Sequence, residues 1–497
     1  MSLNRINLTH NFILSTFVVI IIGIVNIIYP ILIGLMYLPE TMGNFSVIIS
    51  WVSFVSIPII NGIAPTTSRF IAANSNSKRN IIFTSGVKIS IYYMLFALLL
   101  IPLIGIFVFS LSFFDILFIL ILLFGILFHY LFRHSLQGQE KFKELFIIEI
   151  LSFIIFIISL LFFTILPYFL NWSSMQNFYL LFIPILIYHL SFDVIFIIIH
   201  WKQFSLKGFF VFPDLIKNFL KYAALVGVGS FLNLGINQIQ IIISDLHLSD
   251  FEVGELGFWN SAIASISLIS IALSSIIVPR ITKLLKNNSN VEKPFVNSIN
   301  WALILCILPI FGLLLILIGA YPGFLDKLTL SKYQMETYWL IPILLCFQII
   351  NSLLTAPTIC YFSASENYVK YNSITSFIYS IFVIISWIIL VPLIGIFGFA
   401  AGLAIGAFVF GLSVQIIALV ITKKQIGMHF IILNIIYILI GLSIFLLNYI
   451  PSIVLIIIWS IPILPSLFFG IKKIVGIVKN ESYSIIPSEN NNVENNT

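Results

Sequence analysis

Charged residues are scarce in this sequence. Asp, Glu, Lys and Arg make up 8% of the 497 residues, against about 25% in an average soluble domain, and 60% of the residues are hydrophobic. A chain with so little charge cannot cover a water-soluble surface of this size. The composition excludes a soluble enzyme, a soluble nucleic-acid-binding protein and a disulfide-rich domain, and it indicates a polytopic membrane protein.

Cysteine is also scarce, and a nucleotide-binding motif is lacking. The three cysteines, Cys306, Cys346 and Cys360, lie inside apolar stretches and predict neither a disulfide framework nor a metal site. No GxxxxGK motif occurs, so we do not expect the chain to hydrolyse ATP. The loops between apolar stretches are too short for an extramembrane catalytic domain. We therefore predict that the protein is not an enzyme and needs no cofactor.

The sequence consists mainly of long apolar stretches. A membrane-spanning helix needs about 20 apolar residues, and stretches such as FDILFILILLFGILFHYLF lack the alternation of barrel strands. The sequence predicts an all-α protein with about 14 transmembrane helices. Their approximate limits are 11–37, 45–68, 86–109, 113–132, 145–168, 178–200, 222–244, 257–279, 298–320, 338–361, 371–392, 397–421, 430–449 and 453–470.

The basic residues predict an orientation. With the N-terminus in the cytoplasm, 22 of the 24 Lys and Arg residues fall on the inner side, and only Lys327 and Lys332 fall outside. One missed helix would invert every later loop, so this asymmetry supports the span count. We predict a multi-pass protein of the cytoplasmic membrane with both termini inside and the acidic segment Asp245–Glu255 outside.

The sequence carries a weak internal repeat. A shift of 211 residues aligns Asn26 with Asn237, Gly43 with Gly254 and Arg69 with Arg280 without a gap. A repeat unit of six helices keeps its orientation, so the two units are related by an axis along the membrane normal. We predict four parts: a six-helix lobe 1–221, a six-helix lobe 222–425, an additional helix pair 426–475 and a disordered cytoplasmic tail 476–497.

Five motifs follow one another along the first twelve predicted helices. They are NGIAPTTSRFIA (61–72), RHSLQGQEKF (133–142), LVGVGSFLNLGINQIQIIIS (225–244), IIVPRITKL (276–284) and LVPLIGIFGFAAGLAIG (390–406). In their order and spacing these motifs resemble those of a known transporter family, the Wzx-type polysaccharide flippases of the MATE-like (MOP) superfamily.

The resemblance implies a function and its partners. Members of that family move polyprenyl-linked oligosaccharides from the cytoplasmic to the outer leaflet for cell-surface polysaccharide or glycoconjugate synthesis. The implied partners are the lipid-linked oligosaccharide, membrane lipids, H⁺ or Na⁺, and glycan-assembly proteins; we expect a monomer that binds no nucleic acid. Fourteen helices also resemble the lipid II flippases, although here the first and seventh helices carry no intramembrane arginine.

Two other functions compete with this interpretation. A MATE-type multidrug or metabolite antiporter coupled to a cation would carry a strong intramembrane acid in each lobe, and the sequence predicts none in the second lobe. A membrane enzyme that ligates or polymerises glycans would need a sizeable outer loop bearing Arg and His. The longest predicted outer loops, near 245–256 and 321–337, are short.

Polar residues on the first and seventh helices are candidates for a substrate cavity. Asn and Gln side chains suit sugar hydroxyls, but they also join neighbouring helices by hydrogen bonds in membranes. Arg69 and Arg280, at the inner ends of the second and eighth helices, could bind a pyrophosphate or extend to the membrane interface. The candidates are Asn26, Asn233, Asn237, Gln238, Gln240, Arg69 and Arg280.

Ionisable residues of the sixth helix are candidates for ion coupling. The four-residue spacing puts His189 and Asp193 on one helix face, where the pair could relay a proton or Na⁺ or could simply satisfy itself. We expect Glu149 to be interfacial and His129 to be packed or interfacial. The sequence contains no metal-ligand cluster.

Overall fold

The computed structural model describes most of the chain up to residue 423. The described residues are 14, 17–73, 76–169, 175–204, 214–264, 266, 281, 292–321, 327, 329, 332–333, 338–364, 368–423 and 426. Every regular element within these ranges is a helix, which confirms the predicted all-α class.

The helices before residue 204 form a first group. In chain order they are η1 (Ile24–Ile28), α2 (Tyr29–Met36), α3 (Pro39–Ile57), η2 (Pro58–Ile63), α4 (Ala64–Ala73), α5 (Asn76–Phe109), α6 (Phe113–Gly138), α7 (Phe142–Leu160), η3 (Leu161–Ile165), α8 (Leu166–Phe169), η4 (Met175–Phe182), α9 (Ile183–His200) and η5 (Trp201–Gln203). The elements η1, η2 and η3 are π-helical turns inside longer helices, a feature that often accompanies functional sites.

The helices after residue 213 form a second group. They are α11 (Asp214–His247), α12 (Asp250–Ala264), α14 (Glu292–Ala320), α17 (Leu340–Ala364), α18 (Val369–Ile394) and α19 (Ile396–Ile421).

The observed helices agree with the predicted spans. Within the part of the chain that the structure describes, ten stretches are long and apolar enough to cross a membrane, and they match predicted spans one to seven and ten to twelve. Helix α14 covers the ninth span, and α12 covers the start of the eighth. The chain is therefore a multi-pass membrane protein. The predicted helix pair 426–475, except Ile426, and the predicted tail 476–497 lie outside the described residues.

Local sequence explains how the helices start and stop. Ser112 and Asp115 form a capping box at the start of α6, in which Ser112 N donates to Asp115 Oδ2 over 2.9 Å. Gly395 has φ +55°, a left-handed conformation that glycine adopts at no steric cost, and it makes the tight turn between α18 and α19. A Cβ at Gly406 would lie 2.1 Å from Val383, so glycine is also what lets these two helices approach closely.

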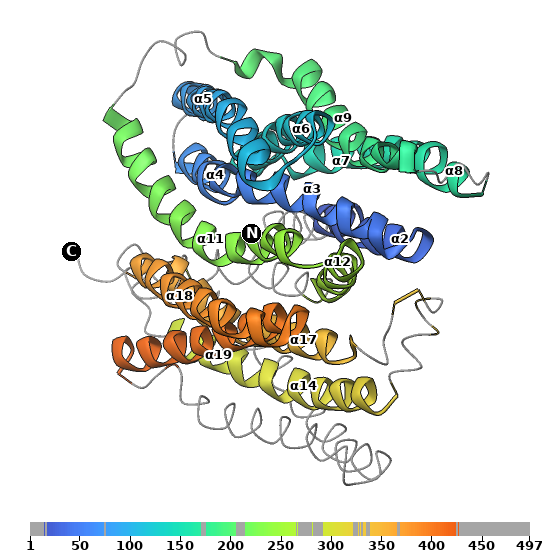
Figure 1. The fold of residues 1–497 in the computed structure, drawn as a ribbon. Coiled ribbons are helices and arrows are strands. Elements are labelled where there is room, and N and C mark those ends of the chain that lie inside the picture. Colours follow the sequence, from blue (N-terminus) through green and yellow to red (C-terminus); the bar gives the residue numbers. More distant parts are fainter. Residues whose placement is uncertain are drawn as a thin grey trace.

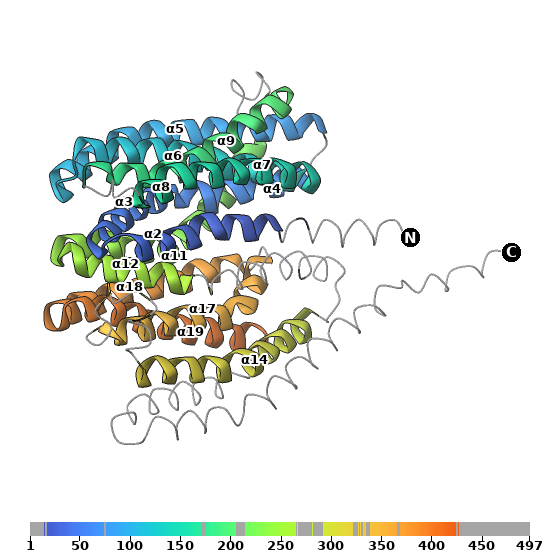
Figure 2. The same cartoon turned by 90° about the vertical axis from the view of Figure 1, so that its right-hand side faces the viewer.

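The two groups meet along four central helices. Figures 1 and 2 show α4–α9 on one side, α14–α19 on the other, and α2, α3, α11 and α12 between them. Helix α3 packs along both α11 and α12: Phe54 and Phe231 have ring centroids 4.9 Å apart, and Gly43 touches Gly254. The helices aligned by the 211-residue shift are therefore the ones at the centre of the molecule.

The bundle has two ends of different charge. We call the end that carries Arg69, Lys141 and Lys202 the basic end, and the end that carries Glu40, Asp115 and Asp250 the acidic end. The sequence predicts that the basic end faces the cytoplasm, by the preference of Lys and Arg for that side.

Candidate functional site

Three helices of the first group enclose a set of ionisable side chains. Helix α7 packs against α9, and α6 packs against both. The side chains that they bury are His129 of α6, Glu149 of α7, and Tyr188, His189 and Asp193 of α9, each at most 5% exposed. We call these five residues the ionisable cluster. Ionisable groups buried inside a membrane protein are costly and mark ion or substrate pathways.

Glu149 is the centre of the cluster. The Tyr188 hydroxyl donates a short hydrogen bond to Glu149 Oε1, and His129 Nε2 lies 3.7 Å from the same oxygen. The His129 ring stacks on Phe192 at 4.0 Å and meets the His189 ring edge-on at 4.8 Å. Aromatic packing therefore fixes the imidazole beside the carboxylate and brings the two histidine rings into contact.

Several atoms of the cluster have no hydrogen-bond partner among the described residues. They are Glu149 Oε2, both oxygens of Asp193, and both ring nitrogens of His129 and of His189. Buried polar atoms are nearly always paired because leaving one unpaired costs about 1–3 kcal/mol. So many open positions in one place are suited to binding protons, water or a small cation.

The structure changes part of the sequence-based interpretation of this region. His189 and Asp193 are both buried on α9, but no hydrogen bond joins them, since all their side-chain polar atoms are unpaired. Glu149, expected at the interface, is fully buried. The signal that could have revealed it was a single carboxylate within an apolar stretch, LFIIEILSF (145–153), which sequence alone could not orient toward α6 and α9.

Tyr130 brings α6 close to the first transmembrane helix. This tyrosine follows His129 on α6, and its hydroxyl lies beside the side chain of Asn26 of η1. The Arg133 guanidinium, one turn further along α6, lies 5.9 Å from the Tyr130 ring centroid. Asn26 itself is exposed. The residue next to His129 therefore approaches a π-helical turn of a central helix.

The second group presents neutral polar residues instead. Asn237 Oδ1 of α11 accepts from Gln348 Nε2 of α17 at 2.8 Å and from the Tyr379 hydroxyl of α18 at 3.0 Å. Gln240 Oε1 accepts from Asn260 Nδ2 at 3.1 Å. Of the other predicted cavity residues on α11, Asn233 and Gln238 are half-buried. Sequence analysis did not identify Gln348, Tyr379 or Asn260 as partners because they lie on other helices.

Arg69 is exposed at the basic end, with its guanidinium 4.3 Å from the Tyr222 ring centroid of α11. It thus bridges the two helix groups. Its predicted counterpart Arg280 lies outside the described residues.

The second group also contains a buried acid that the sequence did not predict. Glu255, assigned to an outer loop, lies inside α12, is fully buried and accepts from Trp259 Nε1 at 3.3 Å. Glu255 lies in a helix because α12 starts at Asp250, seven residues before the predicted eighth span of 257–279. The second lobe therefore contains a buried acid, and the predicted absence of an intramembrane acid there stays a prediction. Within the described ranges, no three His, Cys, Asp or Glu side chains converge to hold a metal ion.

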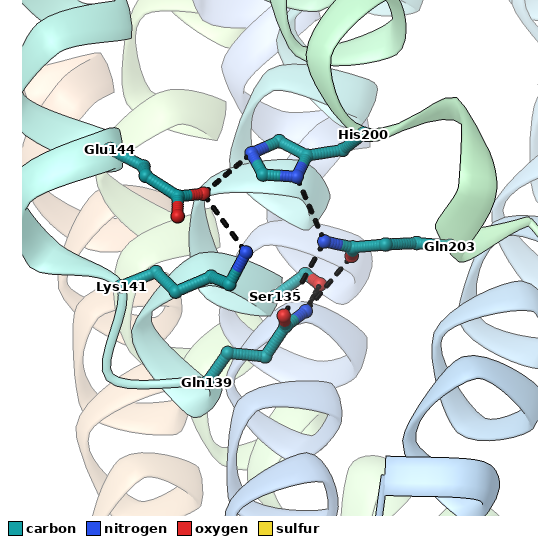
Figure 3. Close-up of polar contacts among 6 residues, drawn as sticks. All are labelled: Ser135, Gln139, Lys141, Glu144, His200 and Gln203. Atoms are coloured by element: carbon teal, nitrogen blue, oxygen red, sulfur yellow. Dashed lines mark hydrogen bonds and ion pairs between the residues drawn. The ribbon is translucent and has the colours of Figure 1, made fainter.

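A polar network ties α6, α7 and α9 together at the basic end (Figure 3). His200 Nε2 and Lys141 Nζ each lie 3.0 Å from Glu144 Oε2. On the other side of the ring, Gln203 Nε2 lies 3.0 Å from His200 Nδ1, and Gln139 Nε2 donates to Gln203 Oε1 at 2.9 Å. These contacts hold in register the three helices that carry the cluster.

Solved structures of transporters have the same fold. An inward-facing multidrug resistance MATE family transporter of the MOP superfamily has a TM-score of 0.62 at 12% identity, covering 81% of this chain and 95% of its own. The lipid II flippase MurJ, in an inward closed conformation, has a TM-score of 0.59 at 14% identity, covering 96% of this chain and 100% of its own. A MOP superfamily transporter from Pyrococcus furiosus, described as having a binding pocket of reversed polarity, has a TM-score of 0.55 at 14% identity, with coverages of 84% and 96%.

No protein-family model and no curated protein matches the sequence. At identities this low the structural similarity establishes the fold, which is that of MATE and other MOP superfamily transporters. The predicted MATE-like architecture is confirmed.

Proposed function

We propose that this chain, which has the fold of MOP superfamily transporters, is a flippase for a polyprenyl-linked oligosaccharide. The supporting observation is the extent of the structural match. The MurJ lipid II flippase covers 96% of this chain, whereas the MATE transporter of highest TM-score among those compared covers 81%. The larger share covered by MurJ means that this chain is longer than a twelve-helix transporter. We expect such additional length in a carrier of a lipid-linked substrate. The product would enter cell-surface polysaccharide or glycoconjugate synthesis.

The proposed transport cycle is alternating access between the two helix groups. In this cycle the central helices α2, α3, α11 and α12 separate first at one end and then at the other. Amide side chains on the first and seventh helices contact the sugars: Asn26, Asn233, Asn237, Gln238 and Gln240. Arg69 and Arg280 bind the pyrophosphate at the basic end, which faces the cytoplasm in this proposal.

The ionisable cluster is the proposed site of ion coupling. Glu149 already has one donor, Tyr188, and one adjacent base, His129, so it can gain or lose a proton without leaving its position. His189 and Asp193 extend the same face of α9 toward the basic end. Tyr130 follows His129 and lies beside Asn26, and in this proposal it carries the effect of protonation to the central helices. We propose H⁺ as the coupled ion, because imidazole groups exchange protons near neutral pH and are poor ligands for Na⁺.

A MATE-type antiporter is the second candidate. Each helix group contains a fully buried acid, Glu149 in the first and Glu255 in the second, as that function would require. Such a protein would expel small cations in exchange for protons and would not move a lipid-linked sugar.

Reconstitution separates the two candidates. The purified protein is placed in liposomes containing a fluorescent polyprenyl-diphosphate oligosaccharide, and a membrane-impermeant quencher reports its leaflet, with and without a pH gradient. Parallel liposomes are loaded with a small fluorescent organic cation. Protein-dependent movement of the lipid-linked sugar supports the flippase. Cation efflux driven by the pH gradient without sugar movement contradicts it and supports the antiporter.

A further inference from the structure

The first transmembrane helix ends at the acidic end of the bundle, where its last carbonyl groups need partners. A helix leaves its final four carbonyl oxygens without intrahelical donors. Tyr37 N closes the last turn by donating to Ile33 O at 2.8 Å. This leaves the carbonyl oxygens of Gly34, Leu35, Met36 and Tyr37 at the end of α2.

A lysine almost three hundred residues away supplies most of these partners. Lys332 Nζ lies 2.6 Å from Leu35 O, 2.8 Å from Met36 O and 3.2 Å from Tyr37 O. An ammonium group carries three donors, and the C-terminus of a helix carries partial negative charge, so one side chain caps the whole turn. Lys332 also lies 6.0 Å from the ring centroid of Tyr168 on α8.

The next residue completes the arrangement. The Tyr333 hydroxyl donates to Gly34 O at 3.0 Å, and its ring stacks on Phe258 of α12 at 4.4 Å and 19°. A Cβ at Gly34 would lie 2.4 Å from Phe258 and 2.8 Å from the Tyr333 hydroxyl, so only glycine lets the helix approach this closely. Every carbonyl from Ile33 to Tyr37 is thereby paired.

These contacts cross between the two helix groups. Lys332 and Tyr333 lie between α14 and α17 in the second group, whereas α2 and α8 belong to the first. When α2 and α12 separate at the acidic end, the lysine and the tyrosine must release α2. Water can then replace both donors on the freed carbonyls, so release remains possible, but the net free energy of the hydrogen bonds, above all those of the charged lysine, favours the closed arrangement.

We propose that Lys332 and Tyr333 form a latch that keeps the acidic end of the transport pathway closed in this conformation. This inference rests on the proposed alternating-access cycle, but it holds whichever substrate is carried. The latch sets the ratio of closed to open molecules at the acidic end. Because a charged hydrogen bond contributes more than a neutral one, Lys332 is the main element and Tyr333 the second.

Distance measurement by pulsed electron paramagnetic resonance tests the latch without any substrate. Spin labels are placed at Leu38, at the start of α3, and at Leu246, near the end of α11, two exposed positions at the acidic end of different groups. Lys332→Met keeps an unbranched side chain, one heavy atom shorter, but removes its charge and donors. Lys327→Met is the matched control, because Lys327 is an exposed residue of the same connection.

We expect Lys332→Met to increase the population of long distances about tenfold, while Lys327→Met matches the parent. Tyr333→Phe, which keeps the stacking on Phe258, should give a smaller increase in the same direction. Tyr333→Phe also tests the latch if Lys332→Met does not fold. Unchanged distance distributions in the variants that fold overturn the latch. A flippase assay that fails while the distances shift would contradict the proposed substrate and leave the latch standing.

Discussion

Gly43 of α3 and Gly254 of α12 lie against each other where these two central helices cross. A Cβ on Gly43 would lie 3.1 Å from Gly254 N and 2.4 Å from Asp250 O. The same two residues are aligned by the 211-residue shift of the sequence repeat. Two residues related by a two-fold axis can touch only if they lie beside that axis. Two parallel repeats of six helices would produce a contact of this kind, and the lobes 1–221 and 222–425 stay a prediction.

The close crossing of α3 and α12 predicts a sensitive position. In Gly254→Ala the new Cβ would lie 1.9 Å from Pro39 O, a backbone atom that cannot turn away. We expect overpacking to cost about 1–3 kcal/mol and to lower the melting temperature in detergent. Gly227→Ala is the control, because its Cβ would lie 3.5 Å from Gly62 Cα, an ordinary contact. Equal melting temperatures for both variants would mean that the helices do not cross as described.

The buried carboxylate of α7 predicts a change in pH dependence. Glu149→Gln keeps an oxygen for the Tyr188 hydroxyl but cannot take up a proton. We expect transport by this variant to lose most of its response to an imposed pH gradient while the protein stays folded. Glu140→Gln, at an exposed residue of the turn between α6 and α7, serves as the control and should respond like the parent. Identical pH responses of the Glu149 variant and the parent would exclude Glu149 from coupling.

The sequence predicted the spans far better than the contacts between them. Uninterrupted apolar runs fix where helices lie, so spans one to seven and ten to twelve were predicted closely. Burial of Glu149 depends on which face of α7 meets α6 and α9, and a helix that is apolar all round carries no such signal. The Lys332 contacts join residues almost three hundred positions apart, and no local pattern in the sequence encodes them.

The amide network of the second group predicts a graded loss of stability. Asn237→Leu leaves Gln348 Nε2 and the Tyr379 hydroxyl without their shared acceptor. We expect a loss of about 1–3 kcal/mol, read as a lower melting temperature. Tyr379→Phe removes one donor and leaves the Gln348 bond to Asn237 in place, so its effect should be smaller. A larger effect of Tyr379→Phe than of Asn237→Leu would contradict this network.

Asp193 and Glu149 should respond differently to neutralisation, although both are buried carboxyl groups near each other. Glu149 has the Tyr188 donor, whereas neither oxygen of Asp193 has a partner among the described residues. An unpaired carboxylate is costly to bury, so the uncharged acid is the form that the surroundings of Asp193 tolerate in this conformation. Asn has the shape of that uncharged acid, and we therefore expect Asp193→Asn to melt within about 2 °C of the parent.

If Asp193 releases its proton when the pathway opens at the other end, the same variant loses gradient-driven transport despite its unchanged stability. A variant that retains gradient-driven transport would assign coupling to Glu149 and His129 alone, and a strongly destabilised variant would show that Asp193 is charged and paired.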